Sequence, residues 1–304
     1  MKLISVERIW HDEKHNAFTD LCSYQNRYYI TFRSATDHYS LDGGLIILCS
    51  EDGTAWKKVA DIKSPRGALR DAKFSSHPDG SLLLHSAYIR DHNEQRLCQS
   101  IVYRSADGQH WDDGKNTGDE NIWIWRAKWN RGSCHAIGYS TKKPLFTRLY
   151  ESTDGLHYRA LVAQLFDTGF SNESDWIYLQ DGTMVVLLRR DGKEDNSAML
   201  GLAKPGYTDW SWHDLQIRIG GPALLQLDNG DIIAVIRTYH EDNAQTELFK
   251  LDLEQKSLEK LITLPSSGDC SYAGVIQKDS EVWISYYSSH EDDSTDIYLA
   301  KLQV

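Results

Sequence analysis

The chain has 304 residues, a formal net charge of -11 and 25% charged residues, with no run rich in Lys or Arg. Binding to nucleic-acid phosphates needs clustered positive charge, so this composition argues against a general nucleic-acid-binding protein. No apolar stretch approaches the length that spans a bilayer, so we expect no membrane partner.

Two-residue turn signals separate extended apolar runs at six places along the chain, spaced 48 to 54 residues apart. Each such pair of runs predicts a β-hairpin. A third apolar run follows every hairpin, and a fourth follows the first five. The sequence therefore predicts six units of up to four strands. The turn pairs are Gln25-Asn26, Asp79-Gly80, Arg131-Gly132, Asp181-Gly182, Asn229-Gly230 and Asp279-Ser280.

The strand missing from the last unit is available at the other terminus. Residues 2–6 form an apolar run that precedes the first unit and has no partner there. Pairing this run with the last unit would close a ring and leave no orphan edge. We therefore predict a single domain over residues 1–304, an all-β six-bladed β-propeller of four-stranded antiparallel blades. A linear β-solenoid or a β-sandwich pair would leave the amino-terminal strand unpaired.

A Ser-x-Asp-Gly-x-x-aromatic stretch occurs at residues 50–56, 105–111 and 152–158. Asp accepts hydrogen bonds from nearby backbone N–H groups and Gly adopts positive φ, so each copy predicts a tight turn. In an up-and-down blade these turns fall at the end opposite the start of the first strand. We expect them to be structural.

Five arginines are predicted at inner-strand ends of different units, facing a central cleft. The planar guanidinium suits binding of a carboxylate. Their convergence would require anionic partners, either protein carboxylates such as Asp71 and Glu173 or a bound anion. For each arginine the alternative is an ordinary ion pair. The five are Arg33, Arg70, Arg126, Arg189 and Arg237.

The Ser-x-Asp-Gly stretches resemble the Asp boxes, or BNR repeats, of the sialidase (neuraminidase) superfamily, whose fold is a six-bladed propeller. Asn172-Glu173-Ser174 followed by Leu188-Arg189 is similar to the sialidase pattern of an Asn-Glu pair and a later arginine. The resemblance implies that Glu173 activates a tyrosine and that Arg189 and Arg237 bind a carboxylate. Tyr272 matches the nucleophilic tyrosine of the family.

The same resemblance places a general acid in the loop of residues 34–43. Asp37 is the first candidate and Asp42 the second. His38 is a partner or a substitute, because its ordinary pKa lies near neutrality. The first arginine of the family's triad has no counterpart in residues 16–20. Arg33, Arg70 or Arg126 could take its place from other positions in the chain.

These features predict an exo-acting, retaining glycoside hydrolase acting on an acidic sugar conjugate such as a sialoside. A phenol paired with a carboxylate meets less charge repulsion at a carboxylate-bearing anomeric carbon than Asp or Glu would. Two alternatives stay open. One is a hydrolase or lyase of uronic-acid glycans in the same cleft, and the other is a propeller that binds a glycan or a protein without catalysis.

The five cysteines are scattered without CxxC spacing, and residues 1–8 turn polar too soon for a signal peptide. Both features are typical of a cytoplasmic protein with reduced thiols. We expect no metal and no cofactor.

Overall fold

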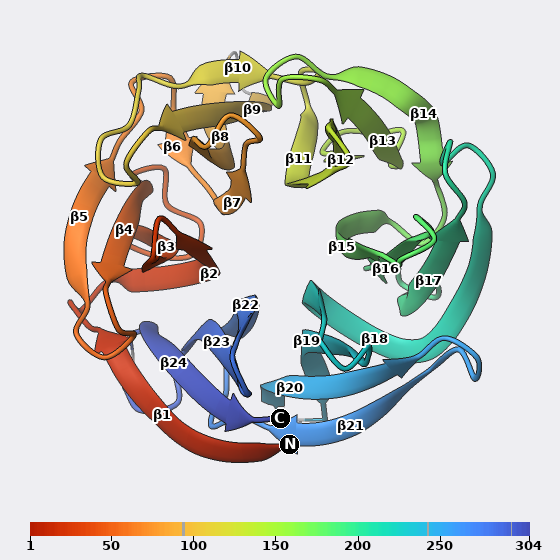
Figure 1. The fold of residues 1–304 in the computed structure, drawn as a ribbon. Coiled ribbons are helices and arrows are strands. Elements are labelled where there is room, and N and C mark those ends of the chain that lie inside the picture. Colours follow the sequence, from red (N-terminus) through yellow and green to blue (C-terminus); the bar gives the residue numbers. More distant parts are fainter. Residues whose placement is uncertain (93–94, 242, 293) are drawn as a thin grey trace.

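A computed structural model of the protein describes residues 1–304 except 93–94, 242 and 293. The elements formed by the described residues are β-strands, and Figure 1 shows them side by side around a common centre. None of the described segments forms a helix with the length and apolar character needed to cross a membrane.

Hydrogen bonding divides the described strands into five antiparallel sheets. The first contains β2 (His15–Tyr24), β3 (Arg27–Ala35), β4 (Gly44–Ser50) and β5 (Lys57–Ile62). The next contains β6 (Ala68–Leu69), β7 (Lys73–Ser76), β8 (Leu82–His92), β9 (Gln95–Ser105) and β10 (Lys115–Thr117), and another contains β11 (Ile122–Asn130), β12 (Ser133–Ser140), β13 (Thr147–Ser152) and β14 (Arg159–Phe166). A seven-stranded sheet contains β15 (Ser171–Tyr178), β16 (Met184–Arg190), β17 (Ser197–Ala203), β18 (Ser211–Gln226), β19 (Ile232–His240), β20 (Asn243–Asp252) and β21 (Ser257–Thr263). The last sheet contains β22 (Cys270–Lys278), β23 (Glu281–Ser288), β24 (Asp296–Gln303) and β1 (Lys2–Trp10).

The predicted propeller of four-stranded antiparallel blades is confirmed, but the prediction of six such blades closed into a ring is wrong, because the described strands form five sheets, one of them seven-stranded. Residues 211–218 of β18 pair with β17, and residues 219–226 pair with β19. One long strand is thus the outer strand of one four-stranded group and the inner strand of the next. No Pro or turn pair interrupts the sequence between Gln216 and Ile219, so the strand continues.

The amino-terminal strand has the predicted partner. β1 pairs with β24 in antiparallel register from Lys2 opposite Gln303 to Trp10 opposite Ile297. The first and last strands of the chain therefore lie in one sheet, and the termini lie close together in Figure 1.

The innermost strands share an irregularity that positions side chains at the centre. β2, β11, β15 and β22 each carry a register shift near the start of the strand, and β18 carries one just after its pairing with β19 begins. β6 and β7 are two short pieces where the other sheets have one strand. A β-bulge bends its strand and redirects a side chain. The residues at these irregular points are Phe18, Asp71, Trp125, Glu173, Gly221 and Tyr272.

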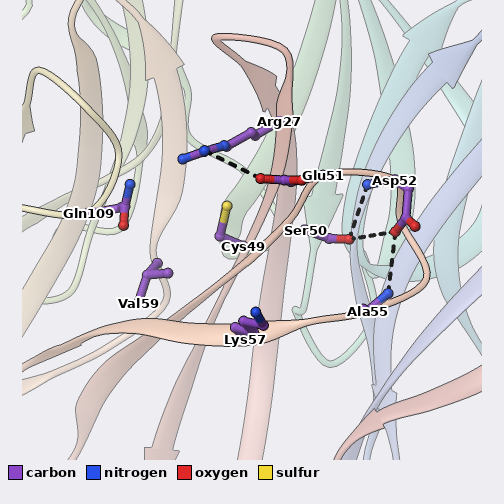
Figure 2. Close-up of a pocket in the computed structure, with 9 residues that line it drawn as sticks. All are labelled: Arg27, Cys49, Ser50, Glu51, Asp52, Ala55, Lys57, Val59 and Gln109. Carbon is purple, nitrogen blue, oxygen red and sulfur yellow. Dashed lines mark hydrogen bonds and ion pairs between the residues drawn. The ribbon is translucent and has the colours of Figure 1, made fainter.

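The Ser-x-Asp-Gly stretches form the predicted turns between the third and fourth strands of their sheets. In the second copy, the Asp107 carboxylate accepts hydrogen bonds from the backbone N–H groups of Gln109 and His110, each at 2.8 Å. Figure 2 shows the first copy, where Ser50, Asp52 and Ala55 line a hollow together with Gln109 of the neighbouring turn. These turns lie at the end of the strands opposite the bulges.

We expect Asp107→Ala to lower the free energy of unfolding by about 1–2 kcal/mol, because two backbone N–H groups lose their acceptor. Any activity at the bulged end should be unchanged. Urea unfolding monitored by tryptophan fluorescence measures the first effect. The matched control is Asp113→Ala in the same loop, an exposed residue for which we expect a change below about 0.5 kcal/mol. Equal effects of the two variants would contradict a structural role for the turn.

Candidate active site

Tyr272 and Glu173 meet at the centre, although they come from sheets on different sides of it. The Tyr272 hydroxyl donates a hydrogen bond of 2.9 Å to Glu173 Oε1. Arg189 Nη1 lies 2.8 Å from the same oxygen and donates to the Tyr272 hydroxyl at 3.2 Å. The backbone N–H of Gly221 donates to Glu173 Oε2 at 2.9 Å. Both carboxylate oxygens of Glu173 are thus held, and one is aimed at the phenol.

The protonation of Tyr272 follows from its surroundings. Burial raises the pKa of the phenol well above its ordinary value, and the nearby Glu173 carboxylate raises it further, while Arg189 and Arg237 act in the opposite direction. The phenol therefore keeps its proton at neutral pH. Reaction as a nucleophile requires a base, and Glu173 Oε1 is the acceptor already in hydrogen-bond contact.

The ring of Tyr272 is fixed by packing. The guanidinium of Arg237 lies over the ring at 4.8 Å, and Phe18 meets it edge-on with centroids 5.0 Å apart. Tyr272 itself has a left-handed φ of 51°, an uncommon conformation for an aromatic residue. The backbone and its neighbours together hold the hydroxyl on Glu173.

Gly221 makes this packing possible. It has a φ of +51°, and a Cβ added there would lie 2.6 Å from Tyr272 Cγ. We expect Gly221→Ala to displace the tyrosine ring and to lower both stability and activity, because the alanine meets backbone strain and a clash. Thermal unfolding and turnover measure the two effects. Gly230→Ala is the matched control, since it also has positive φ but no atom of the described residues within 4 Å of the added Cβ. It should lose stability without a comparable loss of activity, and equal activity losses would contradict the packing argument.

Sequence reasoning missed Asp269 and His15, which form a second cluster beside Tyr272. Asp269 Oδ1 accepts hydrogen bonds from Arg237 at 2.9 Å and from the Tyr287 hydroxyl at 2.7 Å. Its Oδ2 lies 2.8 Å from His15 Nε2 and 2.7 Å from His38 Nδ1. Burial alone would raise the pKa of Asp269, but the two histidines and Arg237 bring it far below its ordinary value. The only sequence signal was that Asp269 directly precedes the strand of Tyr272.

His15, His38 and Asp269 are also the kind of side chains that bind a metal, and their ligand atoms lie within 4.8 Å of one another. The nitrogen–oxygen distances of 2.7 and 2.8 Å are hydrogen-bond lengths. Arg33 Nη1 lies 3.4 Å from His15 Nδ1, and a guanidinium can only donate, so His15 donates through Nε2 to Asp269. The cluster is satisfied as a hydrogen-bonded network.

The loop of residues 34–43 brings His38 toward the centre, whereas the carboxylates of Asp37 and Asp42 accept hydrogen bonds within the loop. The Asp37 carboxylate is exposed and accepts hydrogen bonds from the backbone N–H groups of Tyr39 and Ser40 at 2.7 and 2.8 Å. Hydrogen bonds from Ser40 and Thr36 lower the pKa of Asp42 to about 2. His38 instead packs on Phe18 with ring centroids 5.3 Å apart. The Asp37 carboxylate is therefore held in a turn of its own loop by these backbone N–H groups.

Arg189 and Arg237 contact Tyr272, whereas the other three predicted arginines have different partners. Arg33 is fully buried and donates to the backbone oxygens of Asp37 and Ser40, each at 3.0 Å. Arg70 donates to the backbone oxygen of His38 at 3.0 Å. Both arginines therefore stabilise the loop of residues 34–43, because their guanidinium groups donate hydrogen bonds to its backbone carbonyl oxygens.

Arg126 belongs to an ionic cluster with Asp20, Asp175 and Lys128. Its guanidinium lies 3.2 Å from Asp20 Oδ1 and 3.3 Å from Asp175 Oδ1, and Lys128 Nζ lies 2.5 Å from the same Asp175 oxygen. Arg126 follows the bulge at Trp125, which directs its side chain into this cluster.

Asp71, the remaining predicted residue, lies at the centre between β6 and β7 and is buried.

No protein-family model and no curated protein matches the chain. Solved structures do resemble it. A protein of unknown function from Dyadobacter fermentans has a TM-score of 0.84 at 18% identity, with 100% of this chain and 99% of that chain covered. The GH93 α-L-arabinofuranosidase of Fusarium graminearum, solved with arabinobiose, has a TM-score of 0.77 at 13% identity, with coverage of 100% and 98%. A Trypanosoma rangeli sialidase has a TM-score of 0.67 at 10% identity, with coverage of 95% and 55%. At these identities the likeness establishes the propeller fold, and membership of the sialidase superfamily stays a prediction.

Proposed function

We propose that this protein is a retaining glycoside hydrolase in which Tyr272 is the nucleophile and Glu173 is its base. The observation that carries the proposal is the 2.9 Å hydrogen bond from the Tyr272 hydroxyl to Glu173 Oε1, with Arg189 on both groups. Two solved glycosidases with the same fold, an arabinofuranosidase and a sialidase, support the choice of reaction class.

In the first step the Tyr272 oxygen attacks the anomeric carbon, and its proton passes to Glu173. The bond to the leaving group breaks, and the leaving oxygen takes a proton from a general acid. Water then attacks the same carbon and gives a proton to the conjugate base of that acid, while Tyr272 leaves and regains its proton from Glu173. Two displacements at one carbon give overall retention of configuration.

The first candidate substrate is an acidic sugar conjugate such as a sialoside. Arg189 and Arg237 lie against Tyr272 and have the planar geometry that binds a carboxylate. The tyrosine nucleophile itself favours this substrate, since it avoids placing two negative charges at the reacting carbon.

A neutral arabinofuranoside is the second candidate, and the ion pairs favour it. Arg189 is already paired with Glu173 at 2.8 Å and with Asp191 at 3.1 Å, and Arg237 is paired with Asp269 at 2.9 Å. Arginines whose charge is balanced by protein carboxylates do not require an anionic ligand. The arabinofuranosidase also matches the chain over nearly its whole length.

A matched pair of aryl glycosides tests the function and separates the substrates. We expect release of the aryl alcohol from either the α-sialoside or the α-L-arabinofuranoside, with a product of retained configuration in the NMR spectrum. An unsaturated product absorbing in the ultraviolet would indicate a lyase instead. Tight binding of a glycan without turnover would indicate a propeller that binds glycans without catalysis, and the proposal would be wrong.

A further inference from the structure

Asp71 occupies the same place in its sheet as Glu173 and Tyr272 do in theirs. β6 ends at Leu69 opposite Tyr88, and β7 begins at Lys73 opposite His85, so the residues between them form the break that the other inner strands carry as a bulge. Going around the centre, acidic or phenolic side chains come from alternate positions. The inner strands follow one another in the order β2, β6 with β7, β11, β15, β18 and β22 (Figure 1), and Asp71, Glu173 and Tyr272 come from every second position in this order.

The carboxyl group of Asp71 is buried, with a residue exposure of 6%, and its Oδ1 has no hydrogen-bond partner among the described residues. The other carboxylates buried near it are satisfied: Glu173 is bonded through both oxygens, and so is Asp175. A buried polar atom without a partner is costly in a folded protein and marks a site where a ligand can supply the missing contact.

The charges around Asp71 suit a proton donor. Burial raises the pKa of its carboxyl above the ordinary value, and the negative charge of Glu173 raises it further. Arg70, Lys73 and Arg33 act in the opposite direction without reversing the shift. Two carboxyl groups with different surroundings are a common basis for an acid and a base in one site. Glu173 is paired with Arg189 and accepts a hydrogen bond from the Gly221 N–H, whereas the described residues supply no such contact to Asp71 Oδ1.

We propose that Asp71 is the general acid and base of the glycosidase reaction, in place of Asp37. This inference rests on the proposed function. The Asp71 carboxylic acid gives its proton to the glycosidic oxygen as that carbon–oxygen bond breaks and Tyr272 attacks. In the second step the Asp71 carboxylate takes a proton from the attacking water, and Tyr272 leaves. The sum is one glycoside plus one water giving the free sugar and one alcohol, with every residue restored.

Leaving-group dependence tests this assignment. With Asp71→Asn we expect kcat/KM to fall at least about a hundredfold on a phenyl glycoside, whose leaving group needs a proton. On the 2,4-dinitrophenyl glycoside of the same sugar, which leaves without protonation, the fall should be less than about tenfold. Added azide should raise the turnover of the dinitrophenyl substrate by the variant and yield a glycosyl azide of retained configuration, since azide needs no general base.

Asp37→Asn is the matched comparison, because the same chemical change is made in the loop. We expect it to affect both substrates equally, through loss of the hydrogen bonds to Tyr39 and Ser40. The ratio of rates on the two substrates does not depend on the fraction of folded protein, so a poorly folding variant still gives a clear answer. The inference would be overturned if Asp37→Asn, and not Asp71→Asn, slowed the phenyl glycoside far more than the dinitrophenyl glycoside and gave a glycosyl azide. If wild-type protein turns over neither substrate, the proposed function itself fails.

Discussion

Tyr272→Phe is expected to lower kcat at least about a thousandfold on any glycoside that the protein hydrolyses, because the variant has no nucleophilic oxygen. The ring and its packing against Phe18 and Arg237 are kept, so the fold should survive. Steady-state kinetics and circular dichroism of the same preparation measure both expectations.

Tyr286→Phe is the control for this change. It removes a phenolic hydroxyl from the same sheet, but this hydroxyl donates to the backbone oxygen of Pro265 at 2.9 Å instead of contacting Glu173. We expect stability to fall by about 1 kcal/mol and turnover to stay within about twofold of wild type. Full activity of Tyr272→Phe would mean that the phenol is not the nucleophile.

Asp175→Ala is expected to lower the free energy of unfolding by about 3–5 kcal/mol. Asp175 is two residues after Glu173 on β15, but it lies in the buried cluster with Arg126 and Lys128. Removing its carboxylate leaves the buried Arg126 and the half-buried Lys128 without this partner and also removes the acceptor of the Leu224 N–H. The effect should exceed that of any exposed ion pair in the protein.

Chemical denaturation of wild type and variant measures this loss, with Asp61→Ala as the control. Asp61 pairs with Lys58 at 3.3 Å on the surface, and its removal should change stability by less than about 1 kcal/mol. Burial would raise the pKa of Asp175, but Arg126 and Lys128 lower it overall. Its contribution is therefore present above the unfolded pKa of about 3.9 and is lost as pH falls through the lower folded value. A difference between wild type and variant that grows on acidification would contradict this account.

The placement of Glu173 and Tyr272 at one end of the sheets could be predicted from sequence because strand order and period determine it, whereas their roles came from the resemblance to sialidases. Glu173 and Tyr272 each lie near the start of an inner strand, and antiparallel pairing brings all such starts to one end of the sheets. Arg189 was found in the same way, because it lies near the end of the strand paired with that of Glu173. The partner of the amino-terminal strand followed from the missing strand of the last unit.

The contacts of Asp37 and of the residues that support its loop could not be read in this way, because they depend on loop conformation. The direction of Asp37 is determined by the turn that its carboxylate stabilises, and the burial of Arg33 by the carbonyls of that loop. Asp269 precedes its strand and is placed by contacts to histidines from distant parts of the chain. The count of sheets was wrong because an unbroken β18 carries no turn signal of its own.

Covalent trapping tests the central claim most directly. Fluorine next to the anomeric carbon slows both displacements, and a fluoride leaving group speeds the first, so a fluorinated glycosyl fluoride of the hydrolysed sugar should accumulate on the nucleophile. Peptide mass spectrometry after digestion should then find the glycosyl group on Tyr272. A glycosyl group on Glu173 or on another carboxylate would contradict the account, as would steady hydrolysis with no covalent adduct.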